Sequence, residues 1–503
     1  MAGITRTSLW DSIKVLFYVS SILGLIPYSL REYFSNHVLR ISIIGNLWVI
    51  FNMCLYSVAY HLATDDYIGV GGGGQGTLTN AIGIFIIYME PLMMCIDLIA
   101  SMINQKMLIE CMDRLDKVDQ KLAGENISID NRRIQRYIMI LLVAVLIFEL
   151  LLTTYNFVVF VDVITLWSLL WFVTAFPTGI NSASRIWFVI LVLAVRHRFR
   201  AMNKHMDELA GLLEEHNERW EDELEIEKHN IPMNYLEKEI FTIRSHRGIG
   251  LQSRKLGAPV GTNIINVRPI EKRLEDEKAI ALKQSMFDFL TFDKYMRIDE
   301  KLDKKMILIC RTHDELCEIG KSVNHMFSFQ MLVSMAHGFM AITAQFYFLY
   351  CALSGQDVPI LFRSAQVPQI AVLLIFSIAA KCVICIYVCW KTKTESQRTG
   401  IYMHHLANMV DETHFYQIVN HLSLKLLNHQ FTFSACGFFD LDMTTLYAIT
   451  GAITSYLIIL IQFNLAALQK SGNSTSTATV ASTVATLLNS TEITALSTYV
   501  TKP

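Results

Sequence analysis

Seven long apolar stretches constrain the fold of this 503-residue chain more than any other feature of its sequence. Each is long enough to cross a bilayer as a helix, for which about 20 apolar residues suffice. Pro177 and Asn181 are expected to break or kink the fourth stretch at its outer end. The sequence therefore predicts an all-helical membrane protein with seven transmembrane helices. The stretches are Val38–Leu62, Leu78–Ile103, Tyr137–Val161, Leu166–Val195, Met326–Leu353, Val367–Trp390 and Met443–Gln469.

The composition agrees with a membrane protein, and the sequence shows no nucleophile or metal constellation of the kind that an enzyme needs. Hydrophobic residues make up 52% of the chain and charged residues 17%, and the mean hydropathy is +0.37. The 43 basic and 45 acidic residues leave no basic excess of the kind that nucleic-acid binding requires. Cys382, Cys385 and Cys389 share the sixth stretch, but no His or carboxylate joins them to complete a metal-ligand set. We therefore expect no metal, no cofactor and no catalytic residue.

The connections between the stretches differ in positive charge, and this difference predicts the topology. Lys and Arg are frequent after the second, fourth and sixth stretches and scarce in the alternate connections. Positive connections stay in the cytoplasm, so the amino terminus is predicted to be cytoplasmic and the carboxyl terminus extracellular. Asn473 and Asn489 open glycosylation sequons in the tail that would then be extracellular, whereas the sequon at Asn126 would stay unmodified in the cytoplasm.

This topology divides the chain into seven segments. The cytoplasmic part after the fourth stretch reads as helical extensions around a mobile insert, because Arg244–Pro269 is rich in Gly, Arg and Asn with little periodicity. The segments are 1–37, cytoplasmic; 38–195, transmembrane helices 1–4; 196–325, the cytoplasmic extensions; 326–390, transmembrane helices 5–6; 391–442, cytoplasmic; 443–469, transmembrane helix 7; and 470–503, an extracellular Ser/Thr-rich tail.

The seventh stretch carries one weakly polar face without a charge. Leu457, Leu460 and Ile461 lie on the opposite face, where lipid or other helices can cover them. Small residues one turn apart suit close helix packing, whereas an uncharged polar stripe also suits the wall of a pore. The helix alone leaves both interpretations open. The polar face consists of Thr444, Ala448, Gly451, Ser455, Ile458 and Gln462.

Several motifs near this helix resemble the insect gustatory receptors. Ser455-Tyr456, followed by five apolar residues and Gln462-Phe463, resembles the family signature, although the family has Thr at the position of Ser455. The approach to the helix, Cys436–Tyr447, is also similar to the family. The wider stretch Gly451–Ala467 is most similar to the fructose-sensing subgroup.

This resemblance implies a multi-pass protein of the plasma membrane that assembles as a homotetramer. Residues 391–442 would then form a cytoplasmic anchor, residues 443–469 would line the pore, and residues 38–195 would include elements of an outer ligand pocket. The protein would be a non-selective cation channel gated by a monosaccharide, with fructose as the first candidate, and would act as a taste or nutrient receptor. Ser455 and Gln462 would face the permeant cations, and Phe463 would close the path by dewetting. Two alternatives remain, namely a channel of this family gated by a non-sugar tastant such as a bitter compound, and a metabotropic seven-helix receptor, which requires the opposite topology.

The predicted outer halves of the stretches contain residues suited to a sugar. Aromatic rings cover the apolar faces of a sugar, and polar groups bond its hydroxyls. Aromatic residues are also common at membrane interfaces and in cores, and Glu149 can pair within the bundle instead, for example with Arg185. Arg185 and Lys381 are interpreted as structural partners. The candidate ligand residues are Glu149, Thr153, Asn156, Trp167, Trp171, Thr343, Gln345 and Tyr347.

The predicted topology can be tested with terminal tags. A tag at Met1 should be reached by antibody only after permeabilisation, and a tag after Pro503 should be reached on intact cells, because the positive connections remain inside. Tags found on the opposite sides would instead match the topology of a G-protein-coupled receptor.

Overall fold

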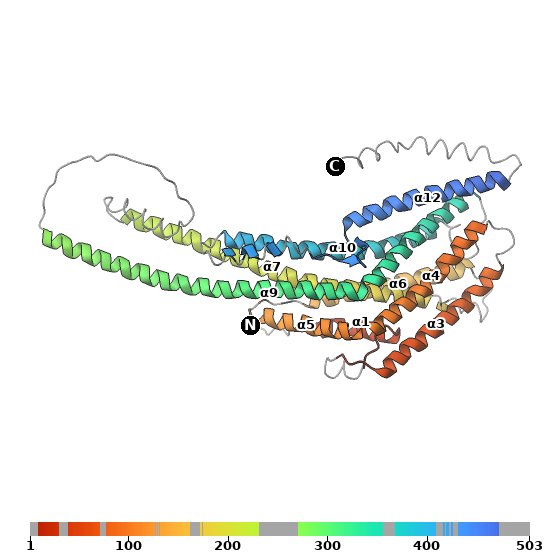
Figure 1. Cartoon of the computed structure of the whole chain (residues 1–503), viewed down its shortest axis with the longest axis horizontal. Coiled ribbons are helices and arrows are strands. Elements are labelled where there is room, and N and C mark those ends of the chain that lie inside the picture. Colours follow the sequence, from red (N-terminus) through yellow and green to blue (C-terminus); the bar gives the residue numbers. More distant parts are fainter. Residues whose placement is uncertain are drawn as a thin grey trace.

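The computed structural model is a nearly all-helical, elongated bundle (Figure 1). Seven helices are long and apolar enough to cross a membrane, which confirms the predicted fold class. They are α3 (Ile43–Val70), α4 (Thr77–Ile103), α6 (Asn131–Phe160), α7 (Ala175–Asn230), α9 (Ile270–Leu353), α10 (Pro368–Ala407) and α12 (Met443–Ser471). The structure describes residues 9–29, 39–70, 77–125, 127, 129, 131–160, 172–173, 175–230, 270–355, 368–408, 416–417, 419–421, 424–425 and 431–471.

Smaller elements accompany these helices. The helix α1 (Leu9–Ile22) precedes the first span, and α5 (Gln105–Gly124) follows α4 with a sharp polar–apolar division between its faces. A two-stranded antiparallel sheet of β1 (Ser434–Ala435) and β2 (Phe439–Asp440) leads into α12, and Ser434 pairs with Asp440. This hairpin packs against α9, because Phe431 and Phe433 are buried in the main hydrophobic core.

The helices differ from the predicted spans mainly in their lengths. Helices α7 and α9 continue far beyond the apolar stretches, as the predicted helical extensions require (Figure 1). The expected break in the fourth stretch is absent from α7. This helix begins at Ala175, so Pro177 lies in the first turn, where no intrahelical N–H bond is lost, and Asn181 lies inside the helix. The beginning of that predicted stretch, residues 166–171, is outside the described residues.

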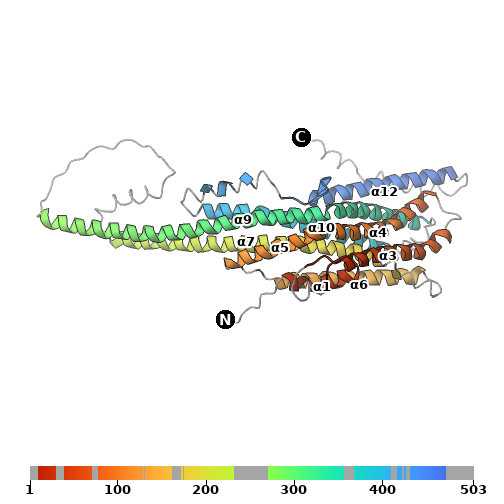
Figure 2. The ribbon, with the colours of Figure 1, turned by 60° about the horizontal axis from the view of Figure 1, so that its bottom comes forward.

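The core of the bundle is built on α7. Among the most apolar 18 residues of each span, 78% are buried in α7, 28% in α10 and none in α12. Helix α7 packs against α4, α6, α9 and α10, whereas α12 lies along one edge of the bundle next to α9 (Figures 1 and 2). A helix with no buried residue in its most apolar window depends on lipid or on other chains to cover it.

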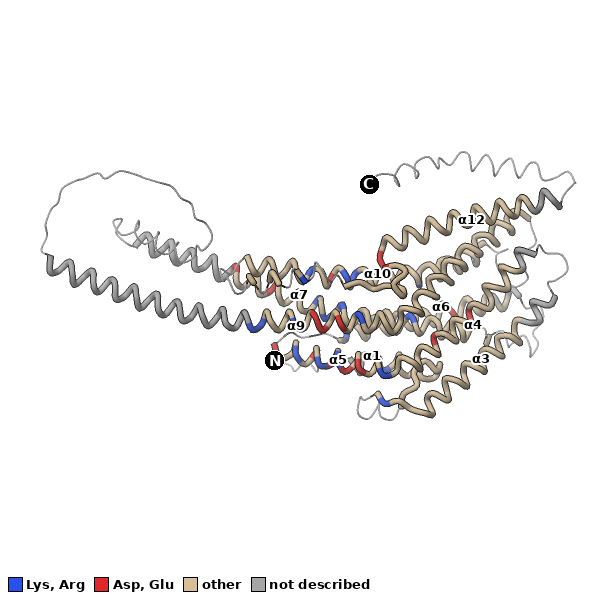
Figure 3. Tube along the Cα trace, viewed as in Figure 1, with Lys and Arg blue, Asp and Glu red and all other residues tan. Residues whose placement is uncertain are grey.

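Charged residues gather toward one end of the molecule. Figure 3 shows them on α5 and on the parts of α7, α9 and α10 that lie beside it, while the described parts of α3 and α12 are almost free of charge. We call this part the charged end of the bundle. It corresponds to the connections that are rich in Lys and Arg, for which a cytoplasmic location is predicted.

An ion pair between Arg198 and Asp119 joins α5 to α7 at the charged end. Arg198 is fully buried, and its Nε and Nη2 each donate to one carboxylate oxygen of Asp119 at 2.7 Å. The Nη1 atom donates to the carbonyl of Ala194, also at 2.7 Å. Both charges are thus compensated in a bidentate geometry that only Arg provides. Nearby in α5, burial raises the pKa of the Cys111 thiol to about 12, so this thiol packs as a neutral apolar group.

Candidate ligand chamber and pore helix

A polar cavity lies between α4, α7, α9 and α10, in the middle of the membrane-spanning bundle. Its volume is about 30 Å³, which accommodates about two water molecules. We call it the chamber. Such a concentration of ionisable groups inside membrane helices is costly and is typical of functional sites. The chamber is lined by Glu90, Thr178, Asn181, Arg185, Ser334, His337, Gly338, Ile378, Lys381 and Cys382.

Glu90 on α4 is the acidic side of the chamber. Asn181 Nδ2 donates to Glu90 Oε2 at 3.0 Å, and His337 Nε2 lies 3.5 Å from Glu90 Oε1. The latter separation is an electrostatic contact that is too long for a good hydrogen bond. Among the described residues, His337 Nε2 and Asn181 Oδ1 are buried without a hydrogen-bond partner. The chamber therefore presents unused hydrogen-bonding atoms to a molecule that enters it.

The basic side of the chamber is formed by Arg185 and Lys381. Arg185 Nε donates to Ser334 Oγ at 2.6 Å. Lys381 forms an ion pair with Glu149, which also accepts a hydrogen bond of 3.3 Å from Ser182 Oγ. Glu149 thus pairs with Lys381 instead of Arg185, the partner considered from the sequence. Glu149 is a partner of a chamber residue and does not itself line the chamber.

The structure separates the candidate ligand residues into different regions. Glu149 and the buried Thr153 lie on α6, whereas Tyr347 packs in a cluster on α9 against α4 and α12. Thr343 donates to the carbonyl of Phe339 on its own helix at 2.8 Å, and Gln345 is buried with Oε1 unpaired among the described residues. Trp167, Trp171 and the side chain of Asn156 are outside the described residues.

From the sequence, no ligand role was assigned to the residues that line the chamber. Arg185 and Lys381 were interpreted as structural, and Asn181 was considered only as a helix breaker. The charged residues inside the spans were the available signal. The helix order that brings Glu90, Arg185, His337 and Lys381 to one cavity is not visible in the sequence.

Helix α12 begins with a well-formed cap. Asp442 Oδ1 accepts the backbone N–H groups of Thr444 at 3.0 Å and Thr445 at 3.2 Å, and the Thr444 hydroxyl at 2.5 Å. These bonds, led by that from the Thr444 hydroxyl, lower the pKa of Asp442, so the cap stays charged at neutral pH. The cap defines where the helix starts and thereby the register of its faces.

The weakly polar face of α12 points away from the subunit's own bundle. Thr444, Ala448, Gly451, Ser455 and Gln462 are exposed, and Ile458 is half-buried. The Ser455 hydroxyl donates to the carbonyl of Gly451 at 3.0 Å, so the face carries no unsatisfied hydroxyl donor there.

The opposite side of α12 packs on α9. Leu457 and Leu460 contact the cluster around Tyr347, and the Tyr456 ring lies 5.6 Å from Phe339 in an edge-on arrangement. Phe463 remains 63% exposed at the level of Gln462. Asn473 and Asn489 are outside the described residues. The arrangement leaves the polar face free to contact copies of itself around an axis.

A seven-helix bundle with a polar chamber inside and an uncovered helix at its edge defines a membrane receptor. Residues 13–231 and 281–467 match the model of the 7tm chemosensory receptor family. The chain belongs to this family and, within it, to the insect gustatory receptors, and it is a multi-pass receptor of the plasma membrane and not an enzyme.

The relatives of the chain refine this assignment. It is 38% identical over 479 residues to the gustatory receptor for bitter taste 66a of Drosophila melanogaster, which covers 92% of this chain and 90% of that protein. It is 26% identical to the putative gustatory receptor 28b of the same species, over 36% of this chain and 37% of that one. These matches do not support the fructose-sensing subgroup. The insect olfactory receptor OR5 from Machilis hrabei shares the fold, with a TM-score of 0.54 at 11% identity over 90% of this chain and 98% of that chain.

The ion pair behind the chamber predicts a charge-swap rescue. Lys381→Met should leave Glu149 uncompensated at a site where its side chain is 13% exposed, at a cost of about 3 kcal/mol. The surface level of the receptor should then fall severalfold. Combining Glu149→Lys with Lys381→Glu should restore most of it, and Lys106→Met, at an exposed position, should have no effect. A double variant no better than Lys381→Met in surface labelling would contradict the pairing.

Proposed function

We propose that this chain is a subunit of a tetrameric, non-selective cation channel that a bitter compound opens. The observation that carries this proposal is the exposure of α12, of which no residue in the most apolar window is buried. The helix combines this exposure with a polar face that bears no charge. One such helix cannot enclose water in a membrane, so several chains around an axis are needed to form a pore.

A bitter ligand is favoured over a sugar by the relatives and by the chamber. The relative that spans most of the chain is a receptor for bitter taste. The chamber combines Glu90, Asn181 and His337 with the apolar Ile378 and Cys382, and no Phe, Tyr or Trp ring of the kind expected for a sugar is among the described residues that line it. This mixture suits an organic molecule with a few polar groups on an apolar body, of which a plant alkaloid is an example.

The chamber also offers a way for ligand binding to change the position of the pore helix. Its present volume of about 30 Å³ is far below that of a tastant, so a ligand has to separate the surrounding helices. Two of these helices, α9 and α10, also pack against α12. A ligand that binds the expanded chamber more tightly would therefore favour a different position of α12, and the closed–open equilibrium would shift.

In the proposed pore, four copies of α12 present Ser455 and Gln462 to the cations. The amide dipole of Gln462 would replace part of the hydration of a cation, and the exposed ring of Phe463 would close the path by dewetting. Since no charged residue lies on this face, the channel should discriminate weakly among cations. The amino terminus would be cytoplasmic and the carboxyl terminus extracellular, as the positive connections indicate.

The pore assignment predicts distinct effects for two neighbouring residues. Phe463→Ala should widen and wet the constriction and produce current without ligand. Gln462→Glu should introduce a ring of carboxylates and shift the reversal potential in Na⁺/Ca²⁺ mixtures toward Ca²⁺. The control Leu457→Ala, on the face packed against α9, should lower surface expression and leave the selectivity unchanged. Wild-type reversal potentials in Gln462→Glu, together with no leak in Phe463→Ala, would place the pore elsewhere.

The chamber assignment predicts the response to ligands. Cells that express only this chain should give currents with one or more bitter alkaloids and none with fructose. Asn181→Ala should shift the half-activating concentration about five- to a hundredfold, since one hydrogen bond to a ligand contributes about 1–3 kcal/mol. Thr343→Ala is the control, because its hydroxyl bonds only the carbonyl of Phe339 among the described residues. Activation by fructose alone, or equal shifts in both variants at equal surface levels, would contradict the proposal.

A further inference from the structure

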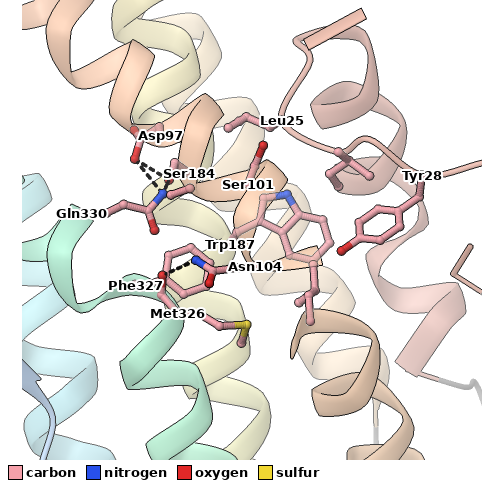
Figure 4. A pocket seen from close by; sticks show the side chains of 13 residues that line it. Leu25, Tyr28, Asp97, Ser101, Asn104, Ser184, Trp187, Met326, Phe327 and Gln330 are labelled. Carbon is pink, nitrogen blue, oxygen red and sulfur yellow. Dashed lines mark hydrogen bonds between the residues drawn. The ribbon is translucent and has the colours of Figure 1, made fainter. Parts of the chain in front are cut away.

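A second cavity lies closer to the charged end of the bundle and shares no lining residue with the chamber (Figure 4). The segment after α1 forms one wall with Leu25, Ile26 and Tyr28, and α4, α7, α9 and the first turn of α5 form the others. The volume of about 50 Å³ accommodates about four water molecules.

Most of the lining is apolar or aromatic, and its polar groups already have partners. Figure 4 shows Trp187, Phe327 and Tyr28 around the cavity. Trp187 Nε1 donates to Ser20 Oγ at 2.8 Å, and the Tyr28 hydroxyl donates to the carbonyl of Gln105 at 2.9 Å. These bonds fix the orientation of the two rings and leave the ring faces and edges to contact a bound molecule.

Asp97 on α4 is the exception among the lining residues. Its side chain is deeply buried, with 6% of the residue exposed. Ser184 Oγ at 3.0 Å and Gln330 Nε2 at 2.9 Å both donate to Oδ1, as Figure 4 shows. Among the described residues, Oδ2 accepts no hydrogen bond. Arg185 attracts the Asp97 carboxylate from a distance and Glu90 repels it, but among the described residues no cation forms an ion pair with Asp97. A buried carboxylate with a free oxygen is costly unless a cation completes it.

We propose that this cavity binds the ammonium head group of a small amphipathic amine. Oδ2 of Asp97 would supply the counter-charge, and the Trp187 and Phe327 rings would contact the N-methyl or N-methylene groups through cation–π interactions. An anion would be repelled by the carboxylate. A divalent metal is disfavoured, because the described residues contain no group of three His, Cys, Asp or Glu side chains that could hold one.

The position of the cavity separates this site from the chamber. Its lining extends to Asn104, directly after the end of α4, where α5 and the charged end begin. An occupant would therefore reach it from the predicted cytoplasmic side of the membrane. Two sources share the required chemistry, the choline head group of a membrane lipid and a free organic ammonium ion.

The proposal can be tested by direct binding, independently of any channel activity. The full chain in phosphatidylglycerol nanodiscs would be titrated with choline and with 3,3-dimethylbutanol, its uncharged isostere, and followed by saturation-transfer NMR. Choline should bind about tenfold more tightly or better, as expected for a charge-assisted contact. This preference should disappear in Asp97→Asn and persist in Glu110→Gln, which removes one exposed negative charge from α5. Equal binding of both probes, or an unchanged preference in Asp97→Asn, would overturn the proposal.

A second variant tests the cavity without altering a charge. Ser101 lines the cavity, and its hydroxyl bonds only the carbonyl of Leu98 on the same helix among the described residues. Ser101→Leu should fill the space and abolish choline binding, and undiminished binding would place the choline elsewhere. Repeating the wild-type titration in phosphatidylcholine nanodiscs distinguishes a lipid head group from a free amine as the natural occupant. If the lipid head group occupies the cavity, free choline should bind more weakly than in phosphatidylglycerol. If the site takes free amines, the affinity for choline should stay the same.

Discussion

A bilayer offers no water to a buried polar group, so each such group in this bundle needs a partner within the protein. Pro91 in α4 is an example, because a proline has no N–H to donate to the carbonyl of Ile87, four residues earlier. The Tyr60 hydroxyl of α3 donates to this carbonyl instead, at 3.0 Å. Glu149 and Lys381 satisfy the same requirement with charges. Among the described residues, His337 Nε2 and Asn181 Oδ1 in the chamber are buried without a hydrogen-bond partner, and we expect a ligand to use them.

The same requirement explains why the subunit is built unevenly. Helix α7 has the largest buried share in its most apolar window, and it also contributes Asn181 and Arg185 to the chamber. Helix α12, with nothing buried in its apolar window, rests on α9 through Tyr456 and Leu457 and exposes its polar stripe. The helices that contact both the chamber and α12 are α9 and α10. In the proposed mechanism, a ligand that alters the chamber would act on α12 through these two packed helices.

Much of the fold was predictable from the sequence, but little of the site was. Span length and charge alternation each depend on local composition, and all seven spans appear in the structure. The partner of Glu149 was not predictable, because the spans contain two cations, Arg185 and Lys381, and the sequence does not tell which of them lies next to Glu149. Tyr347 was grouped with Glu149 from its outer position, yet it faces α4 and α12. The motif in α12 identified the family but not the ligand. The residues that line the chamber lie on α4, α7, α9 and α10, and none of them belongs to that motif.

The sequence by itself specified seven membrane helices, the charged end and an uncharged polar face on the last helix. Each of these features depends only on the hydrophobicity and helical periodicity of residues close together in the chain. Only the tertiary structure decided that Lys381 pairs with Glu149, that Glu90 and His337 meet in the chamber, and that Asp97 keeps one free oxygen in a second cavity. Periodicity tells which side of a helix is polar. It does not tell which neighbour that side meets, because the order and rotation of the helices follow from packing across the whole bundle.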